Sequence, residues 1–255
     1  MKKILVTGAL GQIGSELVPA LRERFGAEQV VASDVRMAPS DGASEGPFEY
    51  VDCVHIREID DVVRRHGIDT IYHLAALLSA VAEDRPRAAW DINMGGLYRV
   101  LEVARQHRCA VFLPSSIGAF GPTTPRVGTP QDTIQRPTTM YGITKVSSEL
   151  LCDYYATRFG LDTRGLRLPG LISYVAPPGG GTTDYAVEIF HQAIRYRHYR
   201  CFLRADTRLD MMYMPDAIRA MIDLMEAEPS RCLLYTSPSP RDGETHLVCS
   251  LLHEK

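Results

Sequence analysis

The sequence lacks a long apolar run. None of its 255 residues belongs to a stretch approaching the roughly 20 apolar residues that cross a bilayer. The apolar segment near the N-terminus ends at Thr7 and Gly8, well short of the apolar region of a signal peptide, and no lipidation motif is visible. We therefore expect a cytoplasmic protein with no membrane partner.

Basic residues are not in excess, and metal-binding patterns are missing. Lys plus Arg number 28 against 31 for Asp plus Glu, a net charge of −3 that does not favour nucleic acid as a partner. The chain has no CxxC, no HExxH and no His/Cys cluster, so we predict no metal site. Its six cysteines are far apart in sequence, which favours reduced thiols in the core over disulfides.

Strand-like and helix-like segments alternate from the first residue, a pattern typical of a doubly wound parallel α/β sheet. We predict buried strands at residues 3–7, 29–33, 70–74, 109–115 and 163–168, with helices between them. The longest helix is predicted from Tyr141 to Phe159, with apolar residues at Val146, Leu150, Leu151 and Tyr154. Residues 1–170 are therefore predicted to form a Rossmann dinucleotide-binding domain.

The regular alternation of strand-like and helix-like segments is interrupted after residue 170. Residues 176–181 are Pro/Gly-rich, and the cluster Thr182-Thr183-Asp184 can cap a helix that runs to about Tyr196. We also expect a strand near residues 201–203 and a last helix from Pro215. Residues 171–231 are interpreted as a small, incomplete C-terminal substrate lobe, which should leave apolar surface of that strand and that helix exposed.

A glycine motif lies between the first strand and the first helix. Gly8, Gly11 and Gly14 form GxxGxxG, and Gln12 and Ile13 complete the loop. Gly8 suits a tight turn, Gly11 lets a pyrophosphate approach the helix N-terminus, and Gly14 lets helix and strand pack closely. Because strand, helix and spacing agree, we predict a dinucleotide site rather than a glycine-rich turn without a ligand.

Asp34 lies at the end of the second predicted strand, twenty residues after Gly14. Its carboxylate can accept hydrogen bonds from ribose hydroxyls and would repel a 2′-phosphate, which favours NAD over NADP. Arg36 tempers that preference, because a nearby arginine can accommodate the phosphate. Asp52 is either a partner for the adenine amino group or a solvated loop residue.

The predicted long helix carries Tyr141 and Lys145 on one face, at spacing i, i+4. A tyrosine, with a reference pKa of about 10, is a poor base unless a cation stabilises its phenolate. Ser116, at the end of the preceding strand, can align a substrate oxygen with the phenol. These three residues are the predicted catalytic group.

Together these motifs resemble the extended short-chain dehydrogenase/reductase family, the branch that includes the nucleotide-sugar epimerases. The resemblance spans residues 4–170 and places the catalytic hydroxyl on Ser116, with Ser115 packing or facing the backbone. It implies that His73 and Trp90 are core or packing residues, and that Asn93 contacts helix backbone rather than substrate. The further cofactor-lining positions that it implies are Leu74, Ala75, Ala76, Asn93, Leu168, Pro169 and Gly170, beside Tyr141 and Lys145.

A narrower resemblance begins where the epimerase pattern R-x-x-N-x-Y-G-P fails. Residues 167–173 read Arg-Leu-Pro-Gly-Leu-Ile-Ser, so the asparagine of that pattern is missing. Residues 113–122, 169–190 and 206–221 are similar to the short-chain type of L-threonine 3-dehydrogenase. The resemblance implies NAD-dependent oxidation of the threonine 3-hydroxyl to 2-amino-3-oxobutanoate, and a homodimer. Under it the substrate residues are Ser79, Ser116, Tyr141, Thr182 and Thr183; capping and loop solvation are the alternatives for Ser79, Thr182 and Thr183.

Two other functions remain open at this point: a nucleotide-sugar epimerase or dehydratase, and a non-catalytic NAD-sensing protein on the same fold. The epimerase would need a pocket for a large phosphorylated ligand, and sensors of this type typically lose the Tyr/Lys pair that this chain keeps.

Residues 232–255 do not resemble the family. The stretch from Cys232 to Asp242 looks like a translated sequencing-adapter read-through, and the family needs further strands and helices here. We expect this tail to be foreign to the fold; the alternative is a shortened natural C-terminus packed on the lobe.

Overall fold

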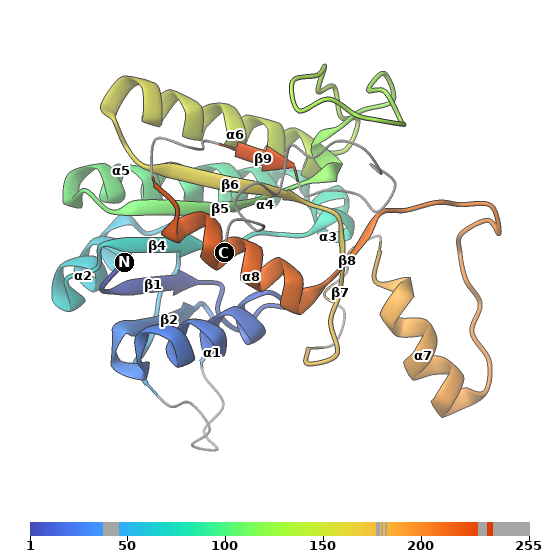
Figure 1. Ribbon diagram of the computed structural model, residues 1–255, viewed down its shortest axis with the longest axis horizontal. Coiled ribbons are helices and arrows are strands. Elements are labelled where there is room, and N and C mark those ends of the chain that lie inside the picture. The colour runs from blue at the N-terminus through green and yellow to red at the C-terminus, as the bar shows by residue number, and fades with distance from the viewer. Residues whose placement is uncertain (38–45, 177–178, 180, 182, 229–233, 237–255) are drawn as a thin grey trace.

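Seven strands form one parallel sheet in the order β3-β2-β1-β4-β5-β6-β9 (Figure 1). The computed structural model describes residues 1–37, 46–176, 179, 181, 183–228 and 234–236. The predicted doubly wound parallel sheet is confirmed, with each strand boundary within about two residues of its prediction. The strands are β1 (Ile4–Thr7), β2 (Val30–Asp34), β3 (Phe48–Tyr50), β4 (Thr70–His73), β5 (Ala110–Ser116), β6 (Thr163–Leu168) and β9 (Leu234–Thr236).

Helices cover both faces of this sheet (Figure 1). One face carries α1 and α8, and the other carries α2, α5 and α6. The helices are α1 (Gly14–Phe25), α2 (Ile56–His66), α3 (Ser79–Asp84), α4 (Pro86–Trp90), α5 (Leu97–His107), α6 (Met140–Phe159), α7 (Tyr185–Tyr196) and α8 (Met214–Glu226). Short helical turns are η1 (Ala27–Gln29), η2 (Asp91–Gly96) and η3 (Ile117–Ala119).

The two cores follow from strand alternation, since successive side chains of a strand point to opposite faces. Leu5 and Ile71 lie in the core beneath α2, α5 and α6. Ile4 and Tyr72, one position away, lie in the core beneath α1 and α8. Full burial of such a side chain contributes roughly 1.5–3 kcal/mol, and these two layers hold the ends of the strands in place.

Helix α8, which is predicted to belong to the C-terminal lobe, packs against the large sheet. Met214, Met221 and Ile222 are buried in the same core as Leu17 and Leu21 of α1. The expectation that this helix exposes its apolar face is therefore wrong. Its stripe of apolar residues at helical spacing covers the sheet beside α1.

The buried face of α6 differs from the apolar face predicted for it. Leu150 and Tyr154 are 63% and 53% exposed, while Lys145 and Glu149 are buried. The face toward the sheet carries polar groups because they meet partners from β5 and β6, as described below. Hydrophobic periodicity alone therefore assigns the wrong side of this helix to the core.

A small second sheet follows the large one. β7 (Gly170–Ile172) pairs in parallel with β8 (Met211–Tyr213), and Gly170 aligns with Met211. The strand expected near residues 201–203 is not formed, and Phe202 is instead exposed against the ring of Tyr185. Helix α7 ends at Tyr196, as predicted, and stands apart from the large sheet in Figure 1.

Only three residues of the expected foreign tail are described. Leu234–Thr236 form β9, which pairs with β6 from Gly165 to Arg167. The rest of residues 232–255 lies outside the described residues, so the expectation about the tail, like the boundary at residue 170, stays a prediction.

Three cysteines, Cys53, Cys109 and Cys152, are free thiols in the core, and burial raises their pKa to about 12. Cys201 is exposed, against expectation. No helix in the described ranges is long and apolar enough to cross a membrane. No group of three or more potential metal ligands occurs within the residues that the structure covers.

Candidate active site

The candidate site lies where the strand order reverses. β1 pairs with β2 on one side and with β4 on the other, so the chain leaves the carboxyl ends of β1 and β4 in opposite directions. Ligands of open α/β sheets bind outside the carboxyl ends of the strands at such a point. The glycine loop follows β1, and residues 74–78 follow β4.

Two glycines are required by the backbone around them. Gly8 adopts a φ of +72°, and a Cβ there would lie 2.7 Å from the backbone nitrogen of Ala75. A Cβ on Gly14 would lie 2.5 Å from the carbonyl oxygen of Ala9. The loop is thereby held against the residues after β4, and α1 begins close to the end of β1.

The same loop fits the pyrophosphate of a dinucleotide. The side-chain Nε2 of Gln12 is buried and has no hydrogen-bond partner within the described part of the chain. Ile13 precedes α1, whose N-terminal N–H groups and dipole favour an anion. An unpartnered donor beside a helix N-terminus is what a phosphate oxygen needs, so these residues suit NAD.

Asp34 ends β2 beside this loop and is only 5% exposed. Its Oδ2 accepts a hydrogen bond from the Leu10 backbone N–H at 3.0 Å. Its Oδ1 accepts from the backbone N–H and the Nε of Arg36, each at 3.0 Å, and Nη2 of Arg36 reaches Oδ2 at 3.2 Å. Burial alone would raise the pKa of Asp34, but these hydrogen bonds outweigh it and lower the pKa below its usual range.

Two other residues predicted on the cofactor side have protein partners. Oδ1 of Asp52 accepts a hydrogen bond from the Val54 N–H at 3.0 Å, in the turn before α2. The Asn93 amide bonds to both the N–H and the carbonyl of Leu77, at 2.8 and 3.2 Å, and donates to Thr144. Asn93 thus fastens the loop after β4, which contains Leu74, Ala75 and Ala76, to α6.

Ser116, Tyr141 and Lys145 come together around Gly118. Ser116 ends β5, and its Oγ accepts a hydrogen bond from the Gly118 N–H at 3.0 Å. A Cβ on Gly118 would lie 3.4 Å from both Ser116 Oγ and the ring of Tyr141. The Lys145 Nζ lies 5.4 Å from the centroid of that ring and donates to the Pro114 carbonyl at 2.7 Å. A buried ammonium beside a phenol and a hydroxyl is an arrangement suited to moving a proton.

Beneath this group lies a buried ion pair that the sequence did not indicate. Nη2 of Arg167 lies 2.8 Å from a carboxylate oxygen of Glu149. Ser115 donates to Glu149 as well, so its hydroxyl is not merely a packing group. Gln135 donates at 2.9 Å to Oε2 of Glu149, the same oxygen that Nη2 of Arg167 contacts, and this bond ties the segment before α6 to the network. The only signal was that Glu149 continues the i, i+4 spacing of Tyr141 and Lys145.

His73 and Trp90 were both predicted to be core or packing residues. His73 is buried, and its Nδ1 lies 2.8 Å from the Thr7 hydroxyl, while its Nε2 has no partner within the part of the chain that is described. Burial and, secondarily, the Lys145 charge lower the pKa of His73 to about 3. Trp90 ends α4 at 46% exposure, so its assignment to the core is wrong.

Two of the predicted substrate residues, Ser79 and Thr183, lie on segments that follow the carboxyl ends of β4 and β6. Ser79 begins α3, and Glu83 of that helix accepts a hydrogen bond from the Met140 N–H at 2.6 Å, at the start of α6. Thr183 packs against Gly170, since a Cβ there would lie 2.6 Å from its Cγ2. Leu168 ends β6, and Pro169 leads into β7. Thr182 lies outside the described residues.

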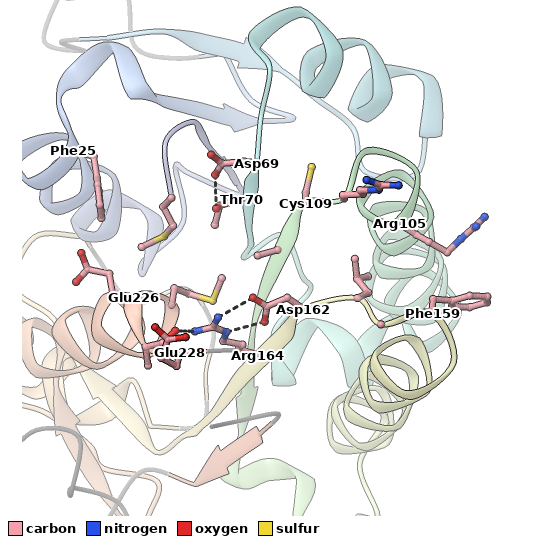
Figure 2. A pocket seen from close by; sticks show the side chains of 17 residues that line it. Phe25, Asp69, Thr70, Arg105, Cys109, Phe159, Asp162, Arg164, Glu226 and Glu228 are labelled. Carbon is pink, nitrogen blue, oxygen red and sulfur yellow. Dashed lines mark hydrogen bonds and ion pairs between the residues drawn. The ribbon is translucent and has the colours of Figure 1, made fainter. Parts of the chain in front are cut away.

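The structure also has a cavity of about 790 Å³ away from this site (Figure 2). Asp69, Thr70 and Arg164 line it, all near the amino ends of their strands. Arg164 pairs there with Asp162 at 2.8 Å and donates to the Leu224 and Ala227 carbonyls at 2.6 and 2.7 Å. These bonds fix the end of α8. The cavity lies at the amino ends of the strands, whereas Ser116 of the catalytic group lies at the carboxyl end of β5.

Comparison with known proteins places this geometry in context. Residues 4–231 match the model of the NAD dependent epimerase/dehydratase family. An uncharacterized epimerase/dehydratase of Staphylococcus saprophyticus is 56% identical over 230 residues, which cover 89% of this chain and 72% of that protein.

Two solved structures represent the two enzyme hypotheses. The L-threonine dehydrogenase of Clostridium difficile is 50% identical, with a TM-score of 0.89 over 95% of this chain and 78% of its own. The UDP-glucose 4-epimerase of Thermotoga maritima is 25% identical, with a TM-score of 0.82 over 92% of this chain and 76% of its own.

Proposed function

Because the chain belongs to the NAD dependent epimerase/dehydratase family, we propose that it oxidises the 3-hydroxyl of L-threonine to give 2-amino-3-oxobutanoate. The observation that carries the proposal is the group formed by Ser116, Tyr141 and Lys145 around Gly118. The 50% identity to an L-threonine dehydrogenase supports the choice of substrate over a nucleotide-sugar.

Each catalytic residue has a separate role in this proposal. Tyr141 removes the proton of the substrate hydroxyl, and the Lys145 ammonium, held by the Pro114 carbonyl, stabilises the phenolate. Ser116 donates to the reacting oxygen and orients it. NAD, when bound, would supply the hydride acceptor for the carbon that carries the reacting oxygen. Asp34 would hold its adenosine ribose, and Gln12 and the α1 N-terminus would hold its pyrophosphate.

The remaining cofactor residues act by position. Leu74, Ala75, Ala76, Leu168 and Pro169 would line the cofactor cleft through backbone and apolar contacts, and Asp52 would meet the adenine. Asn93 acts through Leu77, since its amide groups already bond to that residue and to Thr144.

The zwitterionic end of threonine needs polar partners on the other side of the site. Ser79 at the start of α3 and Thr183 before α7 offer hydroxyls, and Thr182 precedes Thr183 in sequence. The N-terminus of α7 offers backbone N–H groups to a carboxylate. These four features are proposed to bind the substrate.

A direct assay separates the threonine dehydrogenase from its rivals. The purified chain is mixed with NAD and either L-threonine or UDP-glucose, and the absorbance of reduced nicotinamide is followed. We expect NAD to be reduced in the presence of L-threonine and not in the presence of UDP-glucose. Interconversion of UDP-glucose and UDP-galactose without net reduction would establish the epimerase instead. Binding of NAD with no turnover of either substrate would support the non-catalytic sensor.

We also propose a cytoplasmic homodimer. Ile143, Leu150 and Tyr154 of α6 and Tyr98 of α5 are exposed on one side of the molecule, beyond the polar face that α6 turns to the sheet. A second copy would bury this apolar surface. Buried free thiols suit a reducing compartment.

A further inference from the structure

Glu149 of α6 joins four parts of the chain. Its Oε1 accepts hydrogen bonds from the Ser115 hydroxyl of β5 and from Nε of Arg167 in β6, the latter at 3.0 Å. Its Oε2 accepts from Nη2 of Arg167 at 2.8 Å and from Gln135, in the segment before α6, at 2.9 Å. Ser115 and Arg167 are partners in the register of β5 and β6, on the face of the sheet that α6 covers. Every bonding position of the carboxylate is therefore used.

Two hydrogen bonds attach β5 to α6 immediately before the proposed catalytic serine. Lys145 donates to the Pro114 carbonyl at 2.7 Å, and Ser115, the next residue of β5, donates to Glu149. Lys145 and Glu149 lie about 6 Å apart along the helix axis, because an α-helix rises about 1.5 Å per residue. A single bond would let the end of the strand pivot, whereas two bonds fix its direction relative to the helix. The position of Ser116, which follows directly, is set by both.

The bonds to Arg167 and Gln135 hold the Glu149 side chain itself. Arg167 binds both carboxylate oxygens with Nε and Nη2, a bidentate geometry that restricts rotation of the carboxylate. The two charged side chains are 3% and 6% exposed, and the desolvation of such a pair offsets its attraction, so the pair is weak evidence for stability. A fully bonded network in a dry interior does restrict the geometry of its members.

We propose that Glu149 is a positioning residue for the reaction. By holding β5 through Ser115, it fixes the place of Ser116 relative to Tyr141, and it touches neither substrate nor cofactor. The inference rests on the proposed function, because that function uses the hydroxyl of Ser116 and the phenol of Tyr141.

Ser115→Ala tests the attachment of β5 while leaving Ser116 and the ion pair intact. We expect kcat with L-threonine to fall about tenfold, because misplacing reacting groups by about 1 Å costs up to about 10²-fold, while KM and the Kd of NAD stay unchanged. Thr163→Val is the matched control. The Thr163 hydroxyl of β6 also bonds to α6, at the Cys152 carbonyl at 3.1 Å, but at the amino end of its strand. This variant should keep its kcat.

A rescue experiment separates positioning from stability. Glu149→Met/Arg167→Met removes both charges together, so neither is left buried without its partner. Its kcat should fall further than that of Ser115→Ala, with NAD binding retained. Glu149→Gln/Arg167→Met restores an amide that can bond to Ser115 and Gln135, and should recover part of kcat. Equal kcat in the two double variants would contradict the role of these hydrogen bonds.

A readout without substrate separates this inference from the proposed function. Fluorotyrosine placed at position 141 gives a fluorine NMR signal that reports the surroundings of that ring, which lies beside Gly118. We expect the signal to shift or broaden in Ser115→Ala and to stay unchanged in Thr163→Val. An unmodified chain that does not oxidise L-threonine would contradict the proposed function, and the fluorine spectra would still decide the inference. An unchanged fluorine signal in Ser115→Ala, or an unchanged kcat in a chain that oxidises L-threonine, would overturn it.

Discussion

At the residue scale, the proposed chemistry depends on one phenol oxygen. Tyr141→Phe removes only that oxygen, so we expect turnover of L-threonine to fall by about 10²-fold or more, the usual contribution of a general base. Binding of NAD, measured by titration, should be retained. Ser116→Ala should reduce turnover by less, because an orienting hydroxyl transfers no proton.

The matched control for this change lies on the same helix. Tyr154→Phe makes the same substitution at an exposed position of α6 and should leave turnover unchanged. Turnover near that of the unmodified protein in Tyr141→Phe would remove Tyr141 from the mechanism.

The second prediction at this scale concerns His73 and the dependence of folding stability on pH. The pKa of His73 is about 3 in the folded chain, below its ordinary value of 6.5, because burial disfavours the charged form. Between these values the unfolded chain binds the proton and the folded chain does not. Stability should therefore fall as the pH drops below about 6.5, by at most about 1.4 kcal/mol per pH unit from this group, and this loss should end near pH 3.

His73→Asn removes the titration and keeps a polar atom for Thr7. We expect a melting temperature that falls less steeply between neutral and mildly acidic pH than in the unmodified chain, measured by calorimetry in matched buffers. Parallel slopes in the two proteins would show that His73 does not titrate as described.

At the element scale, α6 separates what sequence periodicity predicts from what it does not. The turn at Gly8 and the pairing of Tyr141 with Lys145 are local, so spacing alone identified them. The burial of Lys145 and Glu149 depends on hydrogen bonds to Pro114 of β5 and Arg167 of β6, which are distant from α6 in sequence or separated from it by a long segment. Residues distant in sequence select the polar face of the helix, and no pattern within residues 141–159 contains that information.

The apolar face that α6 leaves exposed leads to a prediction about assembly. Leu150→Glu places a charge in the centre of the exposed apolar surface and should convert the proposed dimer into a monomer, as measured by light scattering after size exclusion. Leu209→Glu, which charges an exposed apolar residue of the segment before β8, should leave the dimer intact. A dimer that survives Leu150→Glu would have to form through another surface.

At the scale of the whole molecule, the doubly wound parallel sheet followed from the alternation of strand-like and helix-like segments in the sequence. The placement of α8 did not follow. The sequence of an amphipathic helix shows which of its faces is buried, but not which other elements pack against that face. Helix α8 shares a core with α1, which lies about two hundred residues earlier in the sequence.

The tail gives a prediction about this scale. We propose that residues 232–255 contribute little to the fold, since the family match ends at residue 231. Their deletion should change the melting temperature by less than about two degrees, the shift that roughly 1 kcal/mol produces in a domain of this size. A fall of several degrees would show that β9 is needed at the edge of β6. Deletion of residues 237–255 alone, which keeps β9, is the control.

Arg164 and the β7–β8 pair together close a long loop at its base. Arg164 fastens the end of α8 to β6, and Gly170 meets Met211 where the chain leaves and re-enters the main body. Everything between these strands, α7 included, is an insertion with fixed ends. The entropy of closing such a loop rises only logarithmically, about 0.6 kcal/mol for each doubling of its length. The segment between β7 and β8 can therefore lengthen, shorten or change sequence in evolution while the large sheet and its helices stay folded.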